Sequence, residues 1–134
     1  MKTRVLQLVL AVLAALALVG CNPGAESPPT ASAVRAVDAE QARELIEDGA
    51  LIVDVRTPEE FSAGHLAGAA NLDVQADDFH DRVRQLDPEQ SYVVYCRTGT
   101  RAAAAAESMV EMGIDDVVNA GGFDDLAAAG IPTR

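Results

Sequence analysis

The chain has 134 residues and a formal net charge of −11. This length allows one domain of ordinary size, and the acidic charge argues against nucleic acid and against a basic membrane-binding face. The sequence contains one lysine, Lys2, and two cysteines, Cys21 and Cys96. If Lys2 is removed with a leader segment, no lysine remains for Schiff-base chemistry.

The first twenty residues have the pattern of an export signal. Lys2 and Arg4 form a basic start, and residues 5–19 are almost entirely apolar. Because this run is shorter than the about 20 residues that a membrane-spanning helix needs, it favours a cleaved signal peptide over residues 1–20. The Leu-Val-Gly-Cys sequence that ends at Cys21 resembles a bacterial lipobox, which implies that Cys21 carries lipid and becomes the mature N-terminus. The alternatives are an ordinary signal peptide and an uncleaved anchor.

Cleavage of this segment has consequences for charge and location. It removes Lys2 and Arg4 but no acidic residue, so the formal net charge falls from −11 to −13. Membrane attachment must then come from lipid on Cys21, and we expect the protein on the periplasmic or extracytoplasmic face of the cell envelope. Residues 21–32 hold three prolines and predict a flexible linker, followed by a folded domain over residues 33–134.

The domain predicts short strands and helices in alternation. In chain order we expect a strand at 33–37, a helix from the Asp38 and Gln41 capping box to Gly49, a strand at 50–55, a helix from the Thr57 and Glu60 capping box to about Ala63, a strand at 69–72, a helix through Phe79, Val83 and Leu86, a strand at 91–96, a helix at 102–112, a strand at 116–119, a turn at Gly121 and Gly122, and a helix at 123–129. The alternation implies an α/β three-layer sandwich, with a mostly parallel five-stranded sheet and helices on both faces.

The segment around Cys96 carries the clearest chemical signal. A strand ends in this cysteine, a loop with one glycine follows, and an alanine-rich helix comes next. The sulfur should therefore lie where unpaired N–H groups and the helix dipole favour negative charge, which lowers the pKa of a thiol. Gly99 should let the loop curl its N–H groups around an exposed thiolate, with Arg97 and Arg101 on the rim to attract an anionic substrate.

Three strand ends should meet at one edge of the sheet, because parallel sheets bind ligands outside the carboxyl ends of their strands. These ends are residues 54–56, 96–97 and 119–122. Arg56 is expected to form an ion pair with Glu60 or, alternatively, to contact substrate. Asp54 is expected to organise loops. No spacing of histidine, cysteine or carboxylates indicates a metal site.

Four segments of the chain resemble a single rhodanese homology domain over about residues 34–134. They are residues 51–61, 64–69, 96–101 and 121–122, in the order and spacing of that family. The resemblance implies a sulfurtransferase that needs no cofactor. Its Cys96 thiolate would take a sulfane sulfur from thiosulfate or a related anionic donor, form a persulfide, and pass the sulfur to cyanide or a thiol. The residues implied in substrate binding are Arg97, Thr98, Gly99, Thr100, Arg101 and Arg56.

Two alternatives belong to other functional classes. One is a persulfide carrier that delivers sulfur to a partner protein, and the other is a phosphatase or arsenate-reductase-like enzyme. Four residues separate Cys96 from Arg101, whereas related phosphatases have five. Because one residue adds up to about 3.5 Å of chain, the shorter loop fits a sulfur atom better than a phosphoryl group.

Overall fold

The computed structural model describes residues 34–134. The expected signal peptide over residues 1–20, the expected lipid attachment at Cys21 and the expected linker over 21–32 lie outside the described residues. Among residues 34–134, no helix has both the length and the apolar character that crossing a membrane requires.

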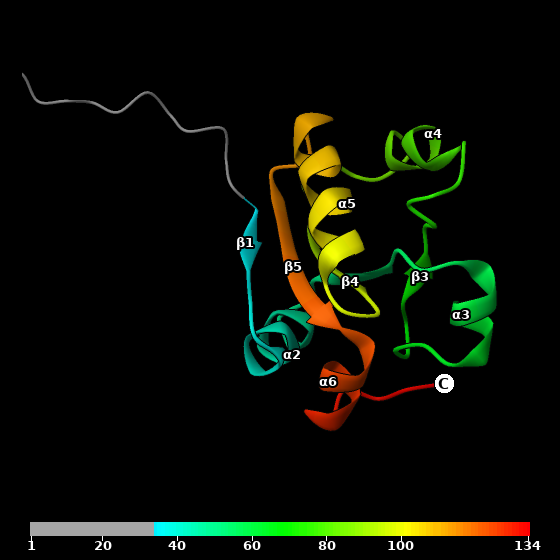
Figure 1. The fold of residues 1–134 in the computed structure, drawn as a ribbon. Helices are drawn as coiled ribbons and strands as arrows, with labels where there is room; N and C mark the ends of the chain where they lie inside the picture. Colours follow the sequence, from blue (N-terminus) through cyan, green and yellow to red (C-terminus); the bar gives the residue numbers. More distant parts are fainter. Residues whose placement is uncertain (1–33) are drawn as a thin grey trace, which may run out of the picture. The chain divides into compact units, whose positions relative to one another are not determined.

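Five strands and five helices alternate along the described residues (Figure 1). The strands are β1 (Arg35–Ala36), β2 (Leu51–Asp54), β3 (Ala70–Asn71), β4 (Ser91–Cys96) and β5 (Asp116–Gly122). The helices are α2 (Ala39–Glu47), α3 (Pro58–Ala63), α4 (Phe79–Val83), α5 (Thr100–Glu111) and α6 (Phe123–Ala128). The type and order of every predicted strand and helix are confirmed, and most bounds differ by a few residues at most.

Both predicted capping boxes are present. The Asp38 carboxylate accepts a hydrogen bond from the N–H of Gln41 at 2.8 Å, and the Gln41 side chain accepts one from the N–H of Asp38 at 3.2 Å. Thr57 and Glu60 make the same reciprocal pair at 3.3 and 3.2 Å. Each box satisfies two N–H groups that a helix start would otherwise leave unpaired, so these local sequences fix where α2 and α3 begin.

The strands form one parallel sheet in the order β1-β5-β4-β2-β3. Strand β4 therefore lies in the middle, with β5 on one side and β2 on the other. This confirms the predicted α/β fold with a five-stranded parallel sheet. The central position of β4 also brings the carboxyl ends of β2, β4 and β5 together, as expected for the strand ends that carry polar residues.

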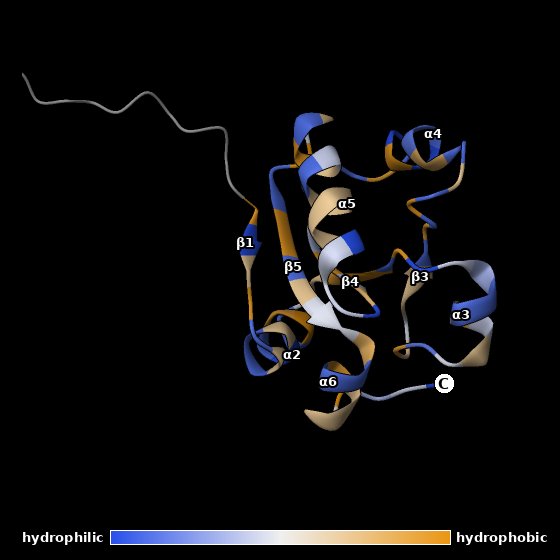
Figure 2. Cartoon of the chain, viewed as in Figure 1, coloured by the Kyte–Doolittle hydropathy of each residue, from blue (hydrophilic) through white to orange (hydrophobic). Residues whose placement is uncertain are grey.

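Helices cover both faces of the sheet, and each face has its own hydrophobic core (Figure 1). Side chains of β4 alternate between the two: Tyr92 and Val94 point into one core, and Val93 and Tyr95 into the other. The first core also takes Phe79 and Val83 of α4 and Ala102, Ala105, Ala106 and Met109 of α5, and the second takes Ala42 of α2 and Leu126 of α6. Figure 2 shows the matching pattern, with apolar strands inside and polar residues along the outer helices.

Strand β5 is longer than the sequence predicts. The predicted strand ends at Asn119, but β5 continues through Gly122, which pairs with Cys96 after a register shift that places one extra residue in β5. Gly121 has φ +82°, a left-handed conformation that glycine adopts easily, and it lies within the strand instead of forming a turn after it. A Cβ on Gly122 would lie 2.6 Å from the carbonyl oxygen of Arg97. The two glycines thus allow β5 to approach the loop after Cys96 closely.

Candidate active site

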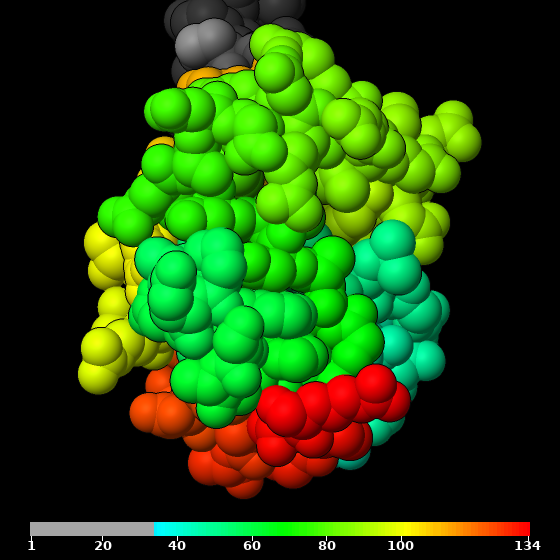
Figure 3. Space-filling model, turned by 90° about the vertical axis from the view of Figure 1, so that its right-hand side faces the viewer, coloured from blue at the N-terminus to red at the C-terminus, as the bar shows by residue number. Residues whose placement is uncertain are grey.

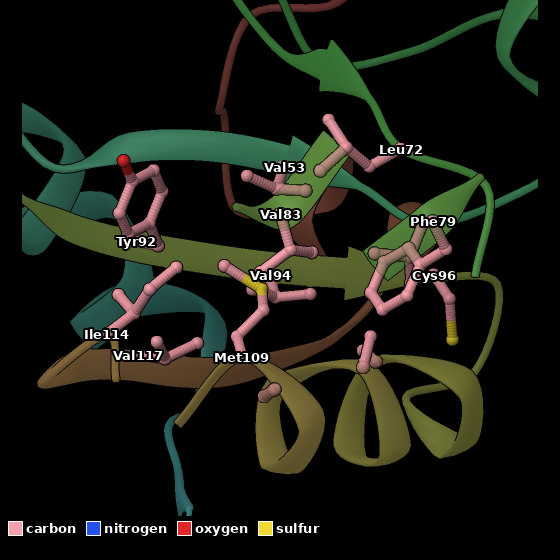
Figure 4. Close-up of a cluster of buried hydrophobic side chains, with 14 residues drawn as sticks. Val53, Leu72, Phe79, Val83, Tyr92, Val94, Cys96, Met109, Ile114 and Val117 are labelled. Carbon is pink, nitrogen blue, oxygen red and sulfur yellow. The ribbon is translucent and has the colours of Figure 1, made fainter. Parts of the chain in front are cut away.

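The loop that follows β4 folds back over its own cysteine. Gly99, with φ +97°, is the N-cap of α5 and donates its N–H to the Cys96 sulfur at 3.0 Å. Figure 4 shows this sulfur at the edge of a hydrophobic cluster, pointing away from the other labelled side chains and toward the first turn of α5. The sequence-based prediction that Gly99 would allow N–H groups to face the sulfur is therefore confirmed.

The electrostatic surroundings of Cys96 favour its thiolate form. Burial, the largest single influence, raises the pKa of Cys96, but the N–H groups of Ala102, Thr98, Gly99 and Arg101 together outweigh it. The net result is a pKa below the ordinary value of a thiol. Main-chain N–H groups carry this effect, so it depends on the shape of the loop more than on the identity of its side chains.

The predicted exposure of the sulfur is wrong. Cys96 is only 1% exposed, because β5 and the loop pack closely around it. Asn119 fixes this packing: its side chain donates to the carbonyl oxygen of Gly99 at 3.1 Å and accepts from the N–H of Gly121 at 2.9 Å. Sequence reasoning gave Asn119 no role, although a polar residue inside the apolar run of β5 was a usable signal.

The ion pairs near the site differ from those predicted. Arg101 binds Glu60 with two hydrogen bonds of 2.7 and 2.9 Å, so its guanidinium lies against a carboxylate of α3. Hydrogen bonds from Arg101 lower the pKa of Glu60 to about 2, against a smaller opposing effect of burial. The expected pair between Arg56 and Glu60 is absent, because Arg56 binds Asp54 at the end of β2 and Glu60 binds Arg101.

Arg56 is part of a buried network below the site. Its guanidinium binds Asp54 at 2.7 to 3.1 Å and donates to the carbonyl oxygen of Gly64 at 2.6 Å. Asp54, which is fully buried, also accepts from the Tyr95 hydroxyl at 2.6 Å, and Tyr95 in turn accepts from the N–H of Leu66. The network joins β2, β4 and the turn after α3, so Asp54 does organise loops as predicted.

A pocket of about 230 Å³ opens beside the Cys96 loop. Its lining residues are Arg56, Glu60, Ala63, Arg97, Phe123 and Asp124. The guanidinium of Arg56 stacks over the ring of Phe123 at 4.6 Å, which gives the pocket a rigid wall. In Figure 3, the segments coloured for α3, for the start of α5 and for α6 meet at the left edge of the space-filling view.

The predicted substrate-binding residues fall into three groups. Arg97, Thr98 and Thr100 are exposed on the loop, and Arg97 lines the pocket. Gly99 is buried against Cys96 and β5. Arg101 is partly buried and forms an ion pair with Glu60. Arg56 lines the pocket, but its Nε and Nη2 atoms already donate hydrogen bonds to protein acceptors. Of the predicted arginines, Arg97 is therefore the one that extends freely toward solvent from the rim.

Comparison with known proteins matches the chain to one family. The family model described as rhodanese-like domain matches residues 38–129. The chain belongs to the rhodanese-like domain family. The matched range contains all four rhodanese motifs recognised in the sequence and both capping boxes of the fold. It also contains the whole loop from Cys96 to Arg101.

Individual rhodanese relatives agree with this assignment. The chain is 30% identical over 103 residues to a thiosulfate sulfurtransferase GlpE of Ectopseudomonas mendocina, an alignment that covers 77% of this chain and 93% of the relative. A rhodanese-related protein of Thermoplasma volcanium has a similar structure, with a TM-score of 0.66, 28% identity, and coverage of 75% of this chain and 97% of that one. A structure described as rhodanese with anions from E. coli has a TM-score of 0.53, 32% identity, and coverage of 62% and 94%.

Proposed function

We propose that this protein is a sulfurtransferase that moves a sulfane sulfur from thiosulfate or a related anionic donor to a thiophilic acceptor through a persulfide on Cys96. The observation that carries the proposal is the N–H group of Gly99 at 3.0 Å from the Cys96 sulfur, with further main-chain N–H groups around it. Relatives named thiosulfate sulfurtransferase at 30 to 36% identity support the same reaction class.

The reaction divides into two displacement steps. In the first, the Cys96 thiolate attacks the outer sulfur of thiosulfate. A new S–S bond forms at Cys96, the S–S bond of thiosulfate breaks, and sulfite leaves with the bonding electrons. In the second, cyanide or a thiolate attacks the outer sulfur of the persulfide, and the Cys96 thiolate leaves. Both the thiolate and the persulfide anion are stabilised by the N–H groups of the loop, and neither step needs a general base at Cys96.

Arginines near the loop would attract the donor. The protein as a whole is strongly acidic, with a formal net charge of −11, so it repels a dianion at long range. Arg97 lines the pocket and is exposed, and Arg101 is close enough to Cys96 for the two charges to interact. Guanidinium groups suit oxyanions because their N–H donors are arranged as a planar fork.

Intact mass spectrometry and steady-state kinetics test this proposal together. Thiosulfate should add about 32 Da to the protein and release sulfite, cyanide should remove that mass, and the kinetics should be ping-pong. The Cys96→Ser variant should neither gain this mass nor release sulfite. An adduct that forms but turns over slowly with small acceptors would indicate a persulfide carrier. Release of phosphate from an aryl phosphate without any sulfur adduct would refute the proposal.

The proposed location follows from the amino-terminal sequence. We infer that residues 1–20 are removed as a signal peptide and that lipid on Cys21 holds the domain at the extracytoplasmic face of the envelope. A protein sulfur acceptor or a thiol would then have to be present in that compartment. Labelling of cells with a fatty acid tests the inference, because the wild type should carry the label and a Cys21→Ser variant should not.

A further inference from the structure

The approach to Cys96 is closed in the structure, although the proposed reaction requires a donor to reach its sulfur. Cys96 is 1% exposed, and the pocket beside it is lined by Glu60 and Arg97 but not by Cys96 itself. A donor that occupies this pocket is therefore still separated from the sulfur. Some group between the pocket and Cys96 has to move before a new S–S bond can form.

Most of the surroundings of the sulfur cannot move easily. On one side, β5 packs main chain to main chain against the loop, since a Cβ on Gly122 would lie 2.6 Å from the Arg97 carbonyl oxygen and one on Gly99 would lie 3.1 Å from the Gly121 Cα. On another side lies the hydrophobic core that includes Phe79 and Ala102. Opening either side would require a shift of the sheet or of a helix.

The groups beside the pocket that can move are two side chains: Glu60, which lines the pocket, and Arg101, which is bound to it. Arg101 is bound to Glu60 by two hydrogen bonds, and it lies close enough to Cys96 for the two charges to interact. The pKa of Arg101 is raised, first by the hydrogen bonds with Glu60 and further by the charge on Cys96, against an opposing effect of burial. Arg101 and Glu60 are 26% and 28% exposed, so they can rotate into solvent without disturbing the core.

We propose that Glu60 is a gate residue: its ion pair with Arg101 closes the approach to Cys96, and an anionic donor opens it by replacing the Glu60 carboxylate on the guanidinium. This inference rests on the proposed function for the identity of the donor. Its new element is that the donor and the Glu60 carboxylate compete for the guanidinium of Arg101. A donor with an oxyanion next to its sulfane sulfur, as in thiosulfate, offsets the loss of the ion pair, whereas a neutral reagent must wait until the pair opens by itself.

Alkylation of Cys96 tests the gate without requiring sulfur transfer. Iodoacetamide is neutral, and in the reaction the thiolate forms an S–C bond while iodide leaves. Its rate measured over a range of pH gives two quantities, a plateau rate for the fully ionised thiolate and an apparent pKa. The plateau reports access to the sulfur, and the apparent pKa reports its electrostatic surroundings. Failure of the proposed function would leave both quantities measurable.

Three variants separate the gate from other effects. Glu60→Gln weakens the ion pair but keeps the capping box, because glutamine also serves at the third position of a helix. Arg101→Gln breaks the same pair from the other side. Glu59→Gln is the matched control: Glu59 is the exposed neighbouring carboxylate on α3, it does not line the pocket, and within residues 34–134 it is not among the hydrogen-bonding or ion-pair partners of Arg101. Thermal unfolding checks that each variant folds.

We expect Glu60→Gln to raise the plateau rate roughly fivefold, the factor that corresponds to a partly exposed ion pair. Its apparent pKa should fall, because a negative charge near the thiolate has been removed. Arg101→Gln should also raise the plateau rate, but its apparent pKa should increase and its reaction with thiosulfate should slow. Glu59→Gln should change the plateau less than about twofold. The gate is refuted if both Glu60→Gln and Arg101→Gln keep the wild-type plateau, or if Glu59→Gln accelerates alkylation as much as Glu60→Gln.

Discussion

Gly122 offers a direct test of the idea that loop shape, and not side-chain chemistry, activates Cys96. Its backbone angle φ is −104°, which alanine adopts without strain, so Gly122→Ala perturbs the site only through its new methyl group. That methyl carbon would lie 2.6 Å from the carbonyl oxygen of Arg97, 3.3 Å from its carbonyl carbon and 3.5 Å from the Cα of Thr98. The main chain of the loop must therefore yield.

The size of the effect follows from this clash. A carbon and an oxygen normally stay at least about 3.2 Å apart, so the loop has to shift by several tenths of an ångström, and overpacking of this kind costs about 1–3 kcal/mol. The shift moves the N–H groups of residues 98–101 relative to the sulfur, where Gly99 now donates at 3.0 Å. Because misplacement of a catalytic group by about 1 Å costs roughly a hundredfold in rate, we expect persulfide formation to slow by about 10- to 100-fold.

The assay is the rate of sulfite release from thiosulfate, together with the pH at which Cys96 is half alkylated by iodoacetamide. That pH should rise in Gly122→Ala because the thiolate loses hydrogen bonds. Gly49→Ala is the control: Gly49 has φ +106° and nothing within 4 Å of an added Cβ, so this variant should lose stability and keep the wild-type sulfite rate. If Gly122→Ala kept both the wild-type rate and the wild-type half-alkylation pH, the loop would not be what activates the thiol.

Four further outcomes are expected. Asp54→Asn leaves the buried guanidinium of Arg56 without its countercharge, which should cost about 3–5 kcal/mol in urea unfolding. Alkylation of Cys96 should be half-maximal at a lower pH than alkylation of a free cysteine. Ionisation of Cys96 should stabilise the fold above the unfolded-state pKa, and this stabilisation should be lost as the pH falls through the lowered folded-state pKa. Glu60, with a pKa of about 2, should stay ionised across that whole range, so a neutral Glu60 cannot explain a loss of activity at mildly acidic pH. Lipid on Cys21 should appear as added mass on the mature protein, and inhibition of lipoprotein signal peptidase should leave residues 1–20 attached.

The local sequence predicted most of the fold, because its signals act over a few residues. The two capping boxes fix the starts of α2 and α3 through hydrogen bonds that span three positions. The apolar run of Ser91–Cys96 and the glycine that follows it fix the strand, the loop and the position of the sulfur at a helix start. The direction of the Cys96 pKa followed from the same local geometry, since the N–H groups that lower it belong to residues 98–102.

The partners of the charged residues were decided only by the tertiary structure. The sequence predicted an ion pair between Arg56 and Glu60, but in the structure Glu60 pairs with Arg101, 41 positions away. The burial of Cys96 likewise depends on β5, whose glycines approach the loop from a distant part of the chain. Short-range hydrogen bonding is encoded by neighbouring residues, whereas ion pairing and solvent exposure depend on which distant segments the sheet brings together, and for that reason the sequence identified the nucleophile but not what covers it.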